Sequence, residues 1–459
     1  MSIGIGKNMA ARIVDITALA VFGVFALMYS VETAYFAEIT IPSPLAGVPL
    51  FVGEGLMLFC AVLYCLKRML RGARPGKWDA ALLVYLLFVA WKAIHGYMEW
   101  GALSLRNTAL FLYPVFAVFF YEFFDARYLV AKPTRYLITL AVGVLFTLRV
   151  PDPYFAYTYL LVFLMFVISL MRDDRRNAFL GLFLVVFPYR ALYAVHRGVF
   201  FAEICSMLFI FIWLAFIRQK KNTAVTRWML AGIPLLFLAG AAVFVDPNAI
   251  KSIVNLDELL EHHRKYMVVA QERKDETDNT SKNTMLLYKK NTAEDRYRMP
   301  QEKYNDPGYQ RSLEGAYKNI LWRLYLWHYM AGEYAEGMPV FGMDLGRPIE
   351  PGIFMSLKWS VGDRWLEPHN SYLHMIYRTG LAGFAMVGVI LVFFARLARR
   401  SVSCRGPKGV LLAACVLYWL VVANFEVILE LPYFAIPLWG FFGMAVKYCD
   451  VQKEKRDTA

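Results

Sequence analysis

The stretch that decides the fold runs from Gly380 to Lys408 and reads GLAGFAMVGVILVFFARLARRSVSCRGPK. Its first part is apolar and almost long enough to cross a bilayer by itself, because a spanning helix needs about 20 mostly apolar residues. The run ends in a cluster of basic residues, and such clusters mark the cytoplasmic end of a membrane helix. The stretch therefore predicts a transmembrane helix whose C-terminal end lies in the cytoplasm.

The same pattern recurs along the whole chain. Of its 459 residues, 59% are hydrophobic and 19% are charged, whereas soluble domains are about 45–50% apolar and about 25% charged. Apolar runs of suitable length lie near 12–30, 48–66, 79–95, 106–124, 135–149, 153–171, 177–195, 199–217, 228–245, 371–396, 409–428 and 431–448. These runs predict an all-α polytopic membrane protein with about 12 transmembrane helices.

The short loops between the runs fall into two classes. Those on one side are rich in lysine and arginine, as in KRMLRGARPGKW (67–78) and RQKKNTAVTR (218–227). Those on the other side are nearly free of both, as in VPDP (150–153) and ELP (430–432). Basic loops stay in the cytoplasm, so both termini are predicted there. The net charge of +13 then reflects topology, and no nucleic-acid partner is implied.

This topology divides the chain into four parts. Residues 1–245 hold the predicted transmembrane helices 1–9, and residues 246–368 form a large loop on the outer side. Residues 369–448 hold helices 10–12, and residues 449–459 are a cytoplasmic tail. None of the six cysteines falls in the outer loop, so no disulfide supports it. Apolar residues at helical spacing within 248–273 and 311–337 predict a partly helical loop.

Several charged residues fall within or beside the predicted helices, where they are costly and usually mark function. The basic ones gather at the outer ends, which the charge rule should leave poor in them: Lys92, Arg106, Arg149, Arg190 and Arg197. Glu54, Glu203 and Glu426 lie near the same ends. One interpretation is that the basic side chains snorkel and form internal ion pairs. The other is an anion site for a lipid-linked phosphate or pyrophosphate, which arginine binds well.

Motifs for other chemistry are absent. The sequence has no Walker loop, GxGxxG before a helix, HExxH or CxxC pair, and therefore predicts no metal and no cofactor. His369 stands in EPHNSYLH (367–374), directly before an apolar run. By itself, a histidine in this place is a helix cap, an interfacial group or a catalytic base. His374 is expected one turn deeper, on a different helix face.

The residues around His369 resemble a known family. HNSYLHMIYRTGLAG (369–383) fits the pattern His-[Asn/Ser/Arg]-x9-Gly-x2-[Gly/Thr/Tyr] of bacterial O-antigen ligases, within the wider ligase and polymerase superfamily. HRGVF (196–200) is similar to that family's Ser-Arg-Gly element, with His196 in place of the serine. RLYLWHYMAGEYAEGMPVFGMDLG (323–346) resembles its Arg-x3-Trp segment that ends in Pro-x-x-Gly. The resemblance covers most of the chain from about residue 190 onward.

This resemblance implies a membrane-embedded glycosyltransferase of the GT-C-like kind at the periplasmic face of the bacterial inner membrane. The donor would be a glycan on undecaprenyl pyrophosphate, the acceptor would be lipid A-core, and the transfer would proceed with inversion and without a metal. His369 would be the general base or would orient the acceptor, and Arg197 and Arg323 would hold the pyrophosphate. Arg190, Arg106, Lys92 and Asn370 are further candidates for substrate binding. Gly380 and Gly383 are expected to serve helix packing.

Three alternatives remain open. An O-antigen or exopolysaccharide polymerase and a protein O-oligosaccharyltransferase belong to the same superfamily. No arginine from residue 190 to 378 has a glycine eleven positions later, and the lack of this polymerase element favours the ligase. A transporter or flippase is the alternative from another class, but such proteins often show internal repeats and midplane sites. The chain has no repeat, and its ionisable residues gather at one face.

Overall fold

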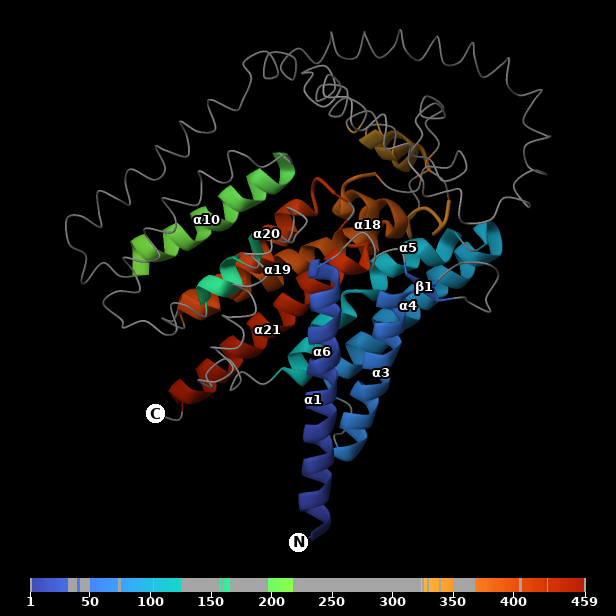
Figure 1. Ribbon diagram of the computed structural model, residues 1–459. Coiled ribbons are helices and arrows are strands. Elements are labelled where there is room, and N and C mark those ends of the chain that lie inside the picture. The colour runs from blue at the N-terminus through green and yellow to red at the C-terminus, as the bar shows by residue number, and fades with distance from the viewer. Residues whose placement is uncertain are drawn as a thin grey trace, which may run out of the picture.

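The computed structural model describes residues 2–31, 39–41, 50–72, 76–101, 103–124, 157–158, 160–165, 197–217, 323, 326–327, 330–337, 340–347, 349, 368–403, 407–426 and 428–457. Within these residues the chain is mostly helical, which confirms the predicted all-α class (Figure 1). The helices are α1 (Ser2–Val31), α3 (Val52–Leu70), α4 (Lys77–Trp100), α5 (Leu103–Leu112), α6 (Val115–Phe123), α10 (Arg197–Ile217), α18 (Ser371–Thr379), α19 (Leu381–Ser403), α20 (Pro407–Val422) and α21 (Pro432–Asp457). Two short strands, β1 (Thr40–Ile41) and β2 (Leu50–Phe51), pair antiparallel ahead of α3.

Two of the predicted spans are broken helices. The run 106–124 is divided at Pro114 between α5 and α6, because proline has no backbone N–H for an intrahelical bond. The run 371–396 is divided at Gly380, which ends α18 with φ +59°, a conformation that glycine adopts readily. The runs 135–149, 177–195 and 228–245 lie outside the described residues, as does most of 246–368.

Two helices among the described residues are long and apolar enough to cross a membrane, Asp79–Trp100 in α4 and Leu381–Val402 in α19. Each of these helices makes polar contacts in two separate places along its length, and the two sets of contacts are called layers below. Near its start, α4 pairs Asp79 with Arg68 at 2.6 Å, and further on Lys92 Nζ lies 3.1 Å from the carbonyl oxygen of Met343. In the other helix, α19, the N–H of the first residue, Leu381, donates to Val340 O. Near the last turn of α19, Arg400 donates to Asp450. At 1.5 Å per residue, the 19 steps from Leu381 to Arg400 span about 28 Å.

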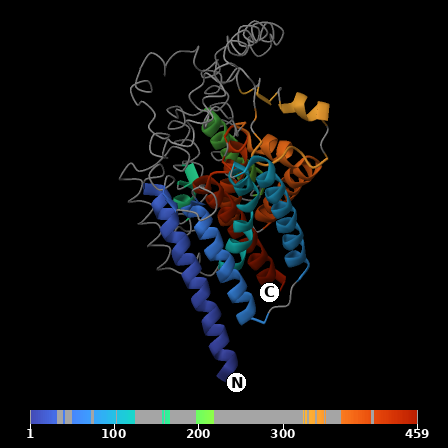
Figure 2. The ribbon, with the colours of Figure 1, turned by 90° about the vertical axis from the view of Figure 1, so that its right-hand side faces the viewer.

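One of these layers lies near the chain termini. Lys67 of α3 is buried and pairs with Asp15 of α1 at 2.5 Å and with Glu122 of α6 at 3.3 Å. In the same region Asp450 of α21 accepts hydrogen bonds from Tyr121 and from Arg400. These contacts join α1, α3, α6, α19 and α21. Figures 1 and 2 show both termini on the side of the molecule away from α18.

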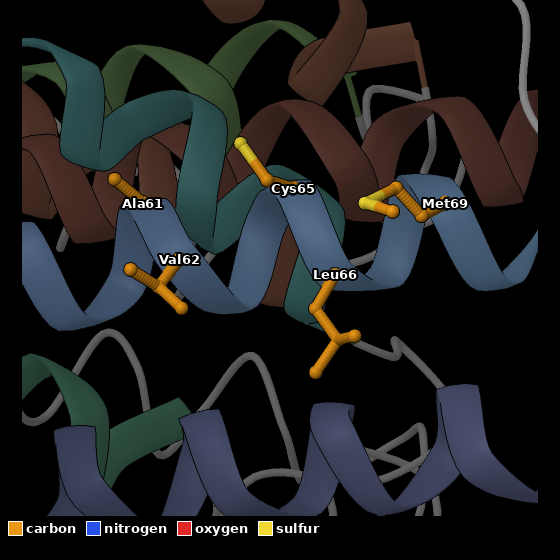
Figure 3. A pocket seen from close by; sticks show the side chains of 5 residues that line it. All are labelled: Ala61, Val62, Cys65, Leu66 and Met69. Atoms are coloured by element: carbon orange, nitrogen blue, oxygen red, sulfur yellow. The ribbon is translucent and has the colours of Figure 1, made fainter.

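Apolar surface is exposed on α3, α4 and α19. On α3 an open hollow is lined by Ala61, Val62, Cys65, Leu66 and Met69 (Figure 3). Large hydrophobic side chains are also exposed along α4 and α19, among them Leu83, Leu87, Ile94, Phe384 and Val392. Exposed apolar surface on this scale marks a contact with lipid or with another protein. The hollow on α3 holds no polar side chain and lies away from the polar cluster described next.

Candidate functional site

The start of α18 is tied to the turn between α20 and α21. Asn370 caps the helix, because its side-chain oxygen accepts the backbone N–H of Leu373 at 2.9 Å. Ser371 N–H donates to Ala423 O, and Ser371 Oγ donates to Glu426 O at 3.0 Å. The bonds to Ala423 O and Asn370 Oδ1 satisfy the N–H groups of Ser371 and Leu373 in the first turn of the helix. The bonds of Ser371 also hold the backbone of residue 370 against residues 423–426.

Three side chains meet at this junction. His369 Nδ1 lies 3.2 Å from Glu426 Oε2, and the other carboxylate oxygen lies 3.5 Å from Arg323 Nη2. Arg323 Nη1 also donates to Phe425 O at 2.6 Å. His369 itself has φ +50°, a left-handed conformation that is uncommon for residues other than glycine and often found at functional sites. The two residues that the sequence predicted as base and anion-binding group are thus joined through Glu426.

The Glu426 carboxylate decides the tautomer of His369. An ionised carboxylate can only accept hydrogen bonds, so Nδ1 must carry the proton and donate it. Nε2 is then the basic nitrogen of the neutral ring. The side chain of His369 is 26% exposed, which leaves the imidazole accessible to a substrate. A carboxylate on Nδ1 also stabilises the imidazolium that forms when Nε2 takes up a proton. The pair is arranged for general base chemistry.

The N-terminal end of α10 lies beside the same turn. Phe201 packs edge-on against Phe425, with ring centroids 5.9 Å apart, and Phe425 directly precedes Glu426. Arg197 is the first residue of α10, four positions before Phe201. The side chains of Arg197 and Arg106 lie outside the described part of the structure, and Arg190 lies outside it altogether.

Lys92, predicted as a substrate-binding residue, is buried against the segment that contains Gly342 and Met343. Its side chain is 4% exposed, and Nζ donates to the carbonyl oxygens of Met343 and Gly342 at 3.1 and 3.5 Å. Asp344 lies 4.0 Å from Nζ and also pairs with His95 at 3.0 Å. Carbonyl dipoles thus surround the ammonium group. Lys92 fixes residues 340–347, hereafter the 340–347 segment, on α4.

A second cluster lies fully buried one turn deeper in α18. Arg378 Nε donates to His374 Nε2 at 2.9 Å, and His374 Nδ1 contacts Glu430 Oε1. Arg378 Nη1 also donates to the carbonyl oxygens of Asp344 and Arg347, at 2.8 and 2.7 Å. The side chains of His374 and Arg378 are 0% exposed. This cluster joins α18, the turn after α20 and the 340–347 segment.

Glycines allow these segments to approach closely. Gly342 has φ +70°, and a Cβ there would lie 2.4 Å from the backbone nitrogens of Thr379 and Gly380. A Cβ on Gly383 would lie 2.6 Å from Ile376 Cα and Met375 O. Gly383 therefore packs α19 against α18, as predicted. Gly380 instead separates the two helices, with φ +59° at the end of α18.

Sequence reasoning did not assign a role to four residues of the two clusters. Glu426 was only one of three glutamates near the outer ends, and its pairing with His369 spans 57 residues. His374 and Arg378 have an i, i+4 spacing, which brings side chains together on a helix. Their charge within an apolar run and the nearby Glu430 were the available signals. Among the described residues no group of three or more His, Cys, Asp or Glu side chains could hold a metal ion.

The chain matches no model of a known protein family, and no curated protein is significantly similar to it.

Proposed function

We propose that this chain is an O-antigen ligase, which transfers a glycan from undecaprenyl pyrophosphate to lipid A-core. The proposal rests on the resemblance around His369 and on one structural observation. Glu426 accepts from Nδ1 of His369 and lies within 3.5 Å of Arg323, so that a base and a cation face the same carboxylate. A reaction that removes a proton from a hydroxyl and releases an anionic leaving group requires both types of residue.

His369 acts as the general base in this proposal. Its Nε2 takes the proton from the acceptor hydroxyl while the oxygen attacks the anomeric carbon of the donor sugar. The new bond joins the acceptor oxygen to the anomeric carbon, and the bond from that carbon to the pyrophosphate oxygen breaks with inversion. Glu426 holds the imidazole in the Nδ1–H tautomer and stabilises the resulting imidazolium. Undecaprenyl pyrophosphate leaves as the anion.

Arginines hold the pyrophosphate in this proposal. Arg323 Nη1 donates to Phe425 O, and Nη2 lies 3.5 Å from Glu426 Oε1. Arg197 belongs to the helix end that packs beside Phe425 through Phe201. Arg190 and Arg106 remain further candidates. Lys92 and Asn370 receive supporting roles, because Lys92 binds carbonyl groups and Asn370 caps α18.

We further propose a multi-pass inner-membrane protein with 12 spans and both termini in the cytoplasm. Two helices have the length and apolar composition of membrane spans, and the polar contacts at their two ends are separated by an apolar middle. The roughly 28 Å from Leu381 to Arg400 is close to the thickness of a bilayer's hydrocarbon core, about 30 Å. The layer with His369 would face the periplasm, and the layer with Lys67 and Asp450 would face the cytoplasm.

The lipopolysaccharide of cells that lack this protein tests the function. A ligase predicts that every gel band above the core disappears while lipid-linked polymer accumulates. A plasmid with the wild-type gene should restore the bands, and one carrying His369→Ala, expressed at the same level, should not. Core that carries a single repeat unit would identify a polymerase instead. An unchanged ladder would exclude both activities.

A further inference from the structure

Two histidine–glutamate pairs join the same two segments of the chain. His369 directly precedes Asn370, the cap of α18, and His374 lies within α18. Glu426 and Glu430 belong to the turn between α20 and α21. The first pair is partly exposed, with both side chains about one quarter accessible. The second pair is buried, with side-chain exposures of 0% and 1%. Of the two, only the first can reach a substrate.

Two contacts of His374 determine which of its ring nitrogens carries the proton. A guanidinium group can only donate, so Nε2 of His374 must accept the proton that Arg378 Nε–H shares at 2.9 Å. The ring of His374 then carries its proton on Nδ1, the nitrogen that contacts Glu430 Oε1. His374 is thus a neutral bridge between a cation and an anion. A proton added to Nε2 would remove the bond to Arg378 and place two positive charges side by side.

This bridge holds three backbone segments together. Arg378 Nη1 donates to Asp344 O and Arg347 O and so attaches the 340–347 segment to α18. Glu430 lies four residues after Glu426 in the turn that the start of α18 contacts through Ser371. A shift of this turn relative to α18 would change the distance between His369 Nδ1 and Glu426 Oε2. The contacts of His374 and Arg378 thus fix where this turn lies relative to α18.

We propose that His374, Glu430 and Arg378 are positioning residues that set the geometry of the His369–Glu426 pair. The catalytic part of this inference rests on the proposed function, whereas the geometric part does not. In this role the side chain at position 374 must supply one hydrogen-bond acceptor and one donor, and its protonation state does not change. Glutamine offers both through its amide, while leucine offers neither.

The matched substitutions His374→Gln and His369→Gln therefore have opposite expected outcomes. In the full chain, purified in nanodiscs with lipid-linked donor and lipid A-core, His374→Gln should retain most of the transfer activity. His374→Leu should lower kcat by about 10- to 100-fold with little change in KM, since small misplacements of catalytic groups have effects of this size. His369→Gln keeps a donor for Glu426 but no base, and it should be inactive. The exposed His95→Gln serves as the control and should behave as wild type.

A spectroscopic readout separates this inference from the proposed function. In the NMR spectrum of the full chain with ¹⁵N-labelled histidine, the signal of His374 is identified as the one that is absent from the spectrum of His374→Gln. In the wild-type protein this signal should show the Nδ1–H tautomer from about pH 5.5 to 8.5, a range around the ordinary histidine pKa. The signal of His369 should be unchanged in His374→Gln and shifted in His374→Leu. These measurements need no substrate, so they test the geometric part of the inference even if the chain has another activity.

Three results would overturn the inference. One is a His374→Leu protein with wild-type kcat and an unshifted His369 signal. Another is a His374→Gln protein as inactive as the leucine variant with its His369 signal intact, because His374 would then transfer protons itself. The third is a His374 signal that titrates in this pH range. If His374→Leu does not insert into the membrane, Glu430→Gln is tested in its place. This variant should have a lower kcat than wild type and a shifted His369 signal.

Discussion

Glu426 lies 3.2 Å from Nδ1 of His369, and the same carboxylate lies 3.5 Å from Arg323. The carboxylate thus connects the histidine of the α18 start to the arginine of another segment. Its charge has two effects on the pair: it selects the Nδ1–H tautomer of His369, and it holds the guanidinium nearby. Glu426 is therefore expected to act through its neighbours.

The first prediction concerns this charge. Glu426→Gln keeps an oxygen that accepts Nδ1–H but no longer stabilises the imidazolium, so kcat should fall at least about tenfold while KM for the acceptor changes little. Glu426→Ala should lose more activity, because the imidazole ring of His369 then also loses its hydrogen-bond partner at Nδ1. Steady-state transfer rates of the purified variants measure both effects. Equal activity of Glu426→Gln and wild type would show that the carboxylate has no part in catalysis.

The second prediction concerns Arg323. In Arg323→Lys the positive charge remains, but a lysine cannot bond Phe425 O and Glu426 with the fixed fork of a guanidinium. If Arg323 also binds the donor pyrophosphate, KM for the donor should rise and kcat should fall, and kcat/KM should drop by about tenfold or more. A fall in kcat with an unchanged donor KM would limit Arg323 to positioning Glu426. Inhibition by added pyrophosphate, measured for both proteins, provides an independent value for anion binding.

The third prediction concerns helix packing. Gly383→Ala places a Cβ 2.6 Å from Ile376 Cα and Met375 O, and overpacking of this kind costs about 1–3 kcal/mol. Gly388→Ala in the same helix is the matched control, because nothing lies within 4 Å of its Cβ position and alanine favours helix. Thermal unfolding in detergent should show a lower midpoint for Gly383→Ala alone. Equal midpoints for the two variants would contradict the close contact between α18 and α19.

The fourth prediction concerns the orientation in the membrane. Phe341 belongs to the 340–347 segment and is 54% exposed, while Lys453 is exposed near the C-terminus. In a chain without its native cysteines, Phe341→Cys should react with a membrane-impermeant maleimide added to intact spheroplasts. Lys453→Cys should react only after the membrane is permeabilised. Labelling of Lys453→Cys in intact spheroplasts would reverse the proposed orientation.

Local composition was sufficient for some features of this protein. The apolar run from Gly380 and its basic end predicted a membrane helix, and α19 has the length and composition of one, because both properties depend on residues adjacent in sequence. The all-α class follows in the same way. The break at Gly380 was not predicted, since a glycine inside an apolar run is compatible with a continuous helix as well as with a left-handed turn.

The partners of the charged residues depended on the tertiary structure. His369 was identified from its motif, but its contact with Glu426 joins residues 57 positions apart, and no local pattern encodes that distance. Lys92 was predicted to bind substrate from its place at an outer helix end, and its contacts with the carbonyl oxygens of Gly342 and Met343 join residues about 250 positions apart. The bridge from Arg378 through His374 to Glu430 likewise exists only because α18 packs between two other segments. Composition thus determines which segments are helical and apolar, whereas the packing of distant segments determines which charges meet.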